Sequence, residues 1–400
     1  MKRSPLSLAL CAAAATFAGA ALLPSVTRAA TLAAVPTEQK GAVQALEQAI
    51  NPEQAIHQRI ELYGALRLSV DYSDSDVSSS EVDAYSSSSL PLTDGGVSVS
   101  SNTSMIGFRG MVPINERYQG LWQYEQQINV DTSDSGDVWA TRDSFLGVGG
   151  PFGSLLIGRV NTPFKNMSVA YLGYFNVVNA DSHAIFGASS DGNIGTRLDA
   201  LGSNSITWKV HKGDVSFQAQ YSAAQDNNSN VVDDNNQAAY SAWARWQPGP
   251  FDLDAAWVHY EKFHDIASLD AWRVSAKYQI GPVTLGALYE NIDVDDPLLV
   301  RMDRPAYGAQ VTYSIAPRWI AAAQWNHAEE TDIGDDEADQ YSATLYHPIN
   351  QQLLINFTYT TTRNGDNASY KGVAYSHDDR VGTLPGRNPQ SFSIGAQLKF

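Results

Sequence analysis

Residues that could carry out catalysis are present, but they are not arranged in any recognised catalytic set. The eight histidines show no HExxH or related metal-binding spacing, and the chain has neither GxSxG nor a phosphate-binding loop. Adjacent carboxylates such as Asp295-Asp296 and Asp335-Asp336 fall in predicted loops, where a solvated surface is the simpler explanation. The sequence therefore predicts no enzyme, no metal site and no cofactor, with an outer-rim lipase or protease as the remote alternative.

The first thirty residues have the organisation of a secretory signal peptide. Two basic residues precede an apolar, alanine-rich run from Leu6 to Leu23, and small residues near Ala29 supply a cleavage site. The alternative is an uncleaved membrane anchor, which Pro24 disfavours because the apolar run ends early. Cys11 is the only cysteine and lies in this leader, so the exported chain is predicted to have no thiol or disulfide chemistry.

Composition separates the exported chain from an ordinary soluble protein. No later apolar run is long enough for a membrane-spanning helix, yet the chain has 9 Trp, 19 Tyr and 13 Phe. The net charge is −17, and removal of the leader's three basic residues takes it to −20. That charge argues against general nucleic-acid binding, although an acidic soluble protein would share it.

The segment between the leader and the first predicted strand has a different character. Val43, Leu46 and Ile50 recur at helical spacing, so residues 31–59 are predicted to form one or two short helices. A mobile tail, a periplasmic stalk and a lumenal plug are three interpretations of this extension, and its residues do not decide between them.

From about Ile60 to Phe400, apolar and polar residues alternate with the period of a β-strand. In the last strand, for example, Phe392, Ile394 and Ala396 alternate with serine, glycine and glutamine. Sixteen such segments begin near residues 60, 101, 118, 140, 154, 204, 214, 238, 251, 270, 283, 306, 319, 340, 351 and 390. Short turns and long polar loops follow them in strict alternation. This pattern predicts an all-β fold, a transmembrane antiparallel β-barrel over residues 60–400.

A soluble β-sandwich is the main alternative, because its strands also alternate. Sixteen consecutive strands are too many for one sandwich, and Trp and Tyr at strand ends are typical of membrane girdles. Closing the sheet satisfies every backbone hydrogen bond in lipid, and sixteen strands leave a water-filled lumen. The long connection 161–203 is predicted to be functional, because irregular segments of that length inside a regular fold usually are.

Several segments of this barrel resemble the general porins of Gram-negative bacteria, especially the trimeric group of the Neisseria and Comamonas type. The resemblance is carried by RDSFLGVGGPFGSLLIGR at 142–159, TPFK at 162–165, SNSITW at 203–208, MIGFRG at 105–110 and GAQLKF at 395–400. It covers residues 60–400 and leaves out the extension 31–59. It implies a homotrimer in the outer membrane, an inward fold of loop 161–203 as the constriction, and recognition of Phe400 by the assembly machinery.

The resemblance also implies where the constriction lies, because related porins place wall arginines opposite acids of the inward loop. Arg109 and Arg159 match such wall positions, and Arg197 is the third candidate. Alternation adds Arg67, on the inner face of the first strand, and the candidate loop acids are Asp181, Asp191 and Asp199. Strict alternation puts Arg159 on the same face as Leu155 and Ile157, so an inward Arg159 requires a β-bulge or a strand end.

The predicted function is passive diffusion of small hydrophilic solutes and ions through a water-filled channel. A substrate-specific channel and a surface adhesin or receptor barrel are the alternatives. Expected partners are two further copies of the chain, outer-membrane lipid, and lipopolysaccharide bridged to the acidic loops by divalent cations. Alternation puts nearly equal numbers of basic residues, Arg273 among them, and acidic residues, Glu290 among them, on the predicted inner wall. The sequence therefore does not decide between anion and cation preference.

Overall fold

The computed structural model describes residues 59–87, 90–131, 142–175, 178–192, 198–199, 201–223, 238–263, 266–316, 318–373 and 381–400. The predicted leader and nearly all of the extension 31–59 lie outside these residues, as does Arg197. No helix in the described part of the chain is long and apolar enough to cross a membrane.

Strands dominate the described residues, with a few short helices between them. The strands are β1 (Arg59–Asp74), β2 (Gly96–Ser101), β3 (Met105–Pro113), β4 (Gln119–Gln127), β5 (Ser144–Gly150), β6 (Gly153–Asn161), β7 (Leu201–Lys212), β8 (Val215–Ser222), β9 (Ala239–Trp246), β10 (Phe251–Phe263), β11 (Ala267–Ile280), β12 (Val283–Val294), β13 (Pro305–Ala316), β14 (Trp319–Ala328), β15 (Ala338–Pro348), β16 (Leu353–Asn364) and β17 (Gln390–Lys399). The helical elements are α3 (Ser79–Tyr85), α4 (Pro163–Leu172), η2 (Gly173–Phe175), η3 (Ser182–Ala184) and η5 (Pro297–Met302).

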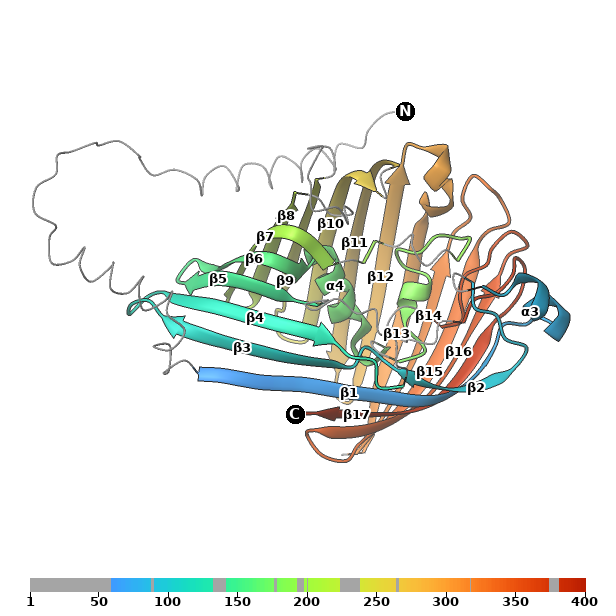
Figure 1. Ribbon diagram of the computed structural model, residues 1–400, viewed down its shortest axis with the longest axis horizontal. Coiled ribbons are helices and arrows are strands. Elements are labelled where there is room, and N and C mark those ends of the chain that lie inside the picture. The colour runs from blue at the N-terminus through green and yellow to red at the C-terminus, as the bar shows by residue number, and fades with distance from the viewer. Residues whose placement is uncertain are drawn as a thin grey trace, which may run out of the picture.

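The strands form one closed antiparallel sheet, in which β17 returns to pair with β1 (Figure 1). Strands β2 and β3 pair with successive parts of β1, β2 with residues 68–73 and β3 with residues 59–65. They are therefore two halves of one barrel strand, and the described chain forms the predicted sixteen-stranded barrel. The sequence predicted a start near 101 for this second strand, whereas β2 begins earlier, at Gly96.

The break between β2 and β3 was not predicted, and it has a local cause. Thr103 adopts a positive φ of 52°, which takes residues 102–104 out of the ladder. The freed Thr103 carbonyl accepts a hydrogen bond of 2.8 Å from Arg67 on β1, and the Ser104 hydroxyl accepts one of 2.9 Å from the Arg67 amide. The break therefore fixes the position of a cationic side chain.

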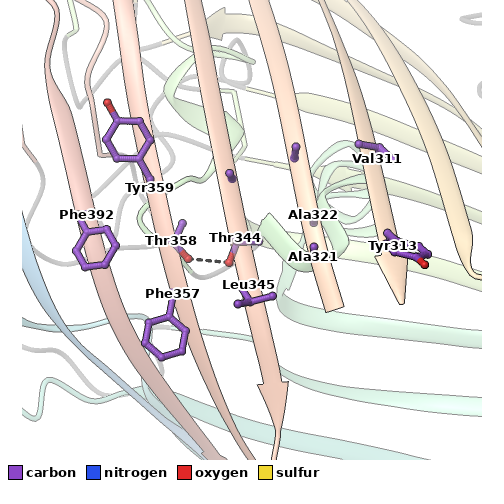
Figure 2. A pocket seen from close by; sticks show the side chains of 12 residues that line it. Val311, Tyr313, Ala321, Ala322, Thr344, Leu345, Phe357, Thr358, Tyr359 and Phe392 are labelled. Carbon is purple, nitrogen blue, oxygen red and sulfur yellow. Dashed lines mark hydrogen bonds between the residues drawn. The ribbon is translucent and has the colours of Figure 1, made fainter. Parts of the chain in front are cut away.

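The outward face of the barrel is apolar, as the alternation predicted. Leu146 is 70% exposed and Ile157 is 59% exposed, which is the environment expected of lipid-facing side chains. Over β13 to β17 this face carries a shallow apolar groove of about 450 Å³ (Figure 2). In Figure 2, Phe357 and Tyr359 flank Thr358, which points the other way and is hydrogen bonded to Thr344 at 2.8 Å.

The inward face is polar and extensively hydrogen bonded across strands. Ser342 bonds Thr360 at 2.9 Å in the row beside the Thr344 pair. Short turns close the hairpins at one end of the barrel, and Gly213, Gly249 and Gly281 occupy the positive-φ positions in three of them. The chain ends at this same end of the barrel, beside β1 (Figure 1).

Gly64 on β1 is predicted to be required for closure. The Gly64 amide donates to the Phe400 carbonyl at 3.0 Å, and a Cβ at Gly64 would lie 2.5 Å from the Phe400 ring and 2.8 Å from the Met105 carbonyl. Gly64→Ala should lower the free energy of unfolding in lipid vesicles by about 1–3 kcal/mol. Gly120→Ala is the matched control, because its Cβ would be no closer than 3.7 Å to a neighbour. Equal effects of the two changes would contradict the closure argument.

Candidate functional site

The long connection after β6 begins with helix α4, which starts at a well-capped position. Thr162 is the N-cap and its hydroxyl accepts a hydrogen bond from the Lys165 amide at 3.2 Å, while Pro163 occupies the first helical turn. α4 packs against β8 to β11. Its buried apolar side chains join the inward-facing residues of these strands in one cluster, which includes Phe164, Met167, Tyr171, Val258 and Tyr260.

From the last turn of α4 onward, the connection lies against the inner face of β13 to β17. Three glutamine side chains on β13, β14 and β15 donate hydrogen bonds to its backbone carbonyls. These bonds fix the backbone of the connection and do not involve its side chains. The pairs are Gln310 with Tyr171 at 2.6 Å, Gln324 with Ala180 at 2.5 Å and Gln340 with Asp181 at 3.3 Å. Asn179 reaches β17, where its amide donates to Ser391 at 3.0 Å.

The end of the connection is fixed by a buried ion network centred on Arg273 of β11. The terminal nitrogens of Arg273 donate to both oxygens of Asp199 at 2.8 and 2.9 Å, and Nε donates to Glu290 of β12. The other Glu290 oxygen accepts the loop amide of Gly187 at 2.8 Å. The Arg273–Asp199 pair is therefore bidentate, and the side chains of Arg273, Asp199 and Glu290 are completely buried.

Arg304, which lies immediately before β13, forms a second clamp on the loop. It donates to the carbonyls of Ile185 at 2.6 Å and Ala188 at 2.9 Å, and to the hydroxyl of Tyr370 at 2.6 Å. Its NH1 also lies 3.8 Å from Glu290. The two buried arginines therefore hold the loop from adjacent positions on the wall.

His183 of η3 bridges two loop acids within the same network. Its Nδ1 lies 2.7 Å from Asp181 and its Nε2 lies 3.3 Å from Asp199. Burial lowers the pKa of His183, but the two carboxylates outweigh burial and the net shift is upward. Burial alone would raise the pKa of Asp199, but Arg273 and His183 together hold that pKa well below its ordinary value. The two carboxylates therefore favour the protonated form of the imidazole.

The predicted site residues fall into separate groups. Asp181 and Asp199 are buried in the network just described, so they do not line the open lumen opposite the wall arginines. Asp191 is exposed on the loop. Arg109 points from β3 to Glu61 at 2.6 Å, and the two side chains of this pair are 50% and 55% exposed. Arg159 is exposed on β6, where the pairing with β7 has a register irregularity between Gly158 and Val160. The register with β5 is regular, so Arg159 keeps the parity of the outward Ile157.

Arg67 is the predicted cation that borders the gap beneath the loop. A pocket of about 290 Å³ lies between Arg67 on β1, the loop backbone near Gly173 and the inner faces of β15 to β17. Arg142 was missed, although it is the first residue of the 142–159 motif; it pairs with Glu125 at 2.5 Å. Arg273 was placed on the inner wall by alternation, but its loop partner could not be read from the sequence.

Within the described residues, no group of three or more His, Cys, Asp or Glu side chains is arranged to hold a metal ion. The arrangement that the described residues do form is a closed barrel with a polar interior, across which a long connection is fixed by buried charges. It defines a transmembrane β-barrel with an internal loop.

Comparison with known proteins agrees with this architecture. The profile of the family described as Gram-negative porin matches residues 7–367, so the chain belongs to the Gram-negative porin family. The major outer membrane protein P.IB of Neisseria meningitidis serogroup A is 27% identical over 222 residues, which are 54% of this chain and 61% of that protein. The P.IB protein of Neisseria sicca is 31% identical over 109 residues, 27% of this chain and 28% of that protein. The matches thus span less than two thirds of these relatives.

Two solved structures show the same fold. The anion-selective porin from Comamonas acidovorans superposes with a TM-score of 0.69 at 15% identity, over 86% of this chain and 100% of that one. OmpT of Vibrio cholerae superposes with a TM-score of 0.60 at 16% identity, over 86% of this chain and 98% of that one. Family and fold together make this chain a Gram-negative outer-membrane barrel.

Loss of Arg273 is expected to destabilise the protein strongly. Arg273→Met leaves Asp199 and Glu290 buried without their shared cation, which should lower the free energy of unfolding by about 3–5 kcal/mol. Arg109→Gln is the control, because the exposed Arg109–Glu61 pair should contribute at most about 1 kcal/mol. Urea unfolding in vesicles measures both changes, and a small effect of Arg273→Met would contradict the anchoring role.

Protonation of His183 is expected to stabilise the loop. Because the pKa of His183 is raised in the folded state, its stabilising contribution is complete below the ordinary pKa of 6.5. That contribution is lost as pH rises through the raised pKa. Hydrogen exchange of residues 178–192, corrected for intrinsic rates, should therefore show weaker protection at alkaline pH. His183→Gln should abolish this pH dependence, whereas His211→Gln at the exposed end of β7 should retain it. Unchanged pH dependence in His183→Gln would refute the assignment.

Proposed function

We propose that the protein forms a water-filled channel in the outer membrane, through which small hydrophilic solutes and ions diffuse passively. We propose further that loop 161–203 is the constriction of this channel. The carrying observation is the Arg273–Asp199–Glu290 network, which fixes an inward-facing loop to the far wall with buried charges. A sixteen-stranded barrel with a polar interior supports an aqueous lumen, because a barrel of that many strands is too wide for side chains to fill.

The proposed constriction has a net positive edge. Asp181 and Asp199 are neutralised within the loop anchor, and Glu125 is paired with Arg142. Arg67 remains at the gap, where its described hydrogen bonds go to neutral acceptors, Gln397 and Thr103. This arrangement supports a preference for anions, and the Comamonas porin with the same fold is named anion-selective.

The proposed assembly is a homotrimer, exported with a leader over residues 1–30 and embedded in lipid and lipopolysaccharide. Support for the trimer comes from one structural neighbour, because OmpT of Vibrio cholerae was solved in a trimer form. The acidic extracellular loops support divalent bridging to lipopolysaccharide, through residues such as Asp332 and Asp335. Phe400, which packs over Gly64, is the proposed assembly signal.

Reconstitution tests the channel itself. Purified protein in planar bilayers should give stable conductance steps in groups of three, and proteoliposomes should swell in uncharged sugars below a size limit. Absence of both conductance and swelling, with the barrel folded by circular dichroism, would refute the proposal.

Ion selectivity tests the constriction. Arg67→Gln should lower the anion-to-cation permeability ratio by about five-fold, because one unit charge near the path contributes on the order of 1 kcal/mol in water. Arg159→Gln is the control, since Arg159 shares the outward parity of Ile157. Reversal potentials in a salt gradient measure both variants. An equal or larger shift for Arg159→Gln would place the constriction elsewhere.

A further inference from the structure

The pocket beneath the loop has two chemically different sides. Arg67 on β1 and Lys399 on β17 line one side. The register pairs Arg67 with Gln397 and Ala65 with Lys399, so the two cations lie on the same inward face as diagonal neighbours. Side chains at such positions are close enough to act on one bound group.

Arg67 is fixed by two hydrogen bonds and keeps further N–H groups that can donate to a ligand. Its Nε donates to Gln397 at 2.8 Å and its NH1 donates to the Thr103 carbonyl at 2.8 Å. A guanidinium has five N–H donors, so these two bonds orient the group and leave donors for a ligand. In the described residues no ion pair with a carboxylate is formed by Arg67 or Lys399.

The part of the pocket that β15 and β16 form is mainly apolar. Tyr346 of β15 and Leu354 of β16 face inward there, next to Val178 of the loop. These residues belong to a small apolar cluster that the loop and wall form together. A hydrated inorganic ion gains nothing from such a surface, whereas a hydrocarbon or aromatic body does.

We propose that this pocket is a weak binding site for small organic anions that carry a carboxylate and an apolar body of about the size of a benzene ring. The carboxylate meets Arg67 and Lys399, and the apolar body packs on Leu354 and Tyr346. The volume of about 290 Å³ admits one such molecule. Weak binding on the solute path raises local concentration without blocking exit. The inference deepens the proposed channel function, in which the pocket lies on that path.

The test is binding measured directly on the full-length exported protein in an uncharged detergent, with benzoate as the probe. Calorimetry or ligand-observed magnetic resonance should show benzoate binding more tightly than acetate, which lacks the apolar body, and than benzamide, which lacks the charge. Benzoate affinity equal to that of acetate or of benzamide would overturn the proposal.

Substitutions test the separate roles of the basic and the apolar parts of the pocket in binding. Lys399→Gln should weaken benzoate binding by up to about five-fold and leave benzamide binding unchanged, as expected for one solvated charge. Leu354→Asn should weaken benzoate binding by about four-fold or more and leave acetate binding unchanged, as expected for the lost apolar contact. Lys212→Gln, at the exposed end of β7, is the matched control and should change neither. Benzoate binding that is insensitive to both pocket changes would also overturn the proposal.

Binding and conduction are separate readouts, so the two proposals fail separately. Normal conductance without preferential benzoate binding would remove the pocket and leave the channel. Preferential benzoate binding without conductance would leave the pocket and remove the channel.

Discussion

The structure depends on one buried ionic contact, between Arg273 of the wall and Asp199 of the loop. A lone buried arginine would be strongly unfavourable, so Arg273 requires both Asp199 and Glu290. Glu290 in turn accepts the Gly187 amide, which ties a second point of the loop to the same site. The long connection therefore has one low-energy position inside the barrel, and the shape of the lumen follows from it.

The second determinant is the interruption of a barrel strand at residues 102–104. A continuous strand would satisfy the Thr103 carbonyl within the ladder, whereas the break offers it to Arg67. The wall thereby positions a cation, and the loop anchor removes Asp181 and Asp199 from the open lumen. Together they leave the gap beneath the loop with a basic side and an apolar side.

Alternation along the chain was sufficient to predict the strands and their faces, because side chains on a strand obey a period of two whatever their partners. It also placed Arg273 inward and warned that Arg159 has outward parity. The pairing of Arg273 with Asp199 could not be predicted, because residues 74 positions apart meet only when the loop crosses the lumen. The break at Thr103 was equally hidden, since no glycine or proline marks it.

The central claim is that the loop crosses the lumen and rests on the far wall, and disulfide trapping tests it directly. Asn179 of the loop donates to Ser391 of β17 at 3.0 Å, and Cys11 lies in the predicted leader, so engineered cysteines meet no other thiol. Asn179→Cys with Ser391→Cys should form a disulfide in intact outer membranes, whereas Asn179→Cys with Ser205→Cys on β7 should not. Failure of the first pair to cross-link, with the thiol introduced by Asn179→Cys labelled instead by a bulky maleimide from outside the cell, would contradict the account.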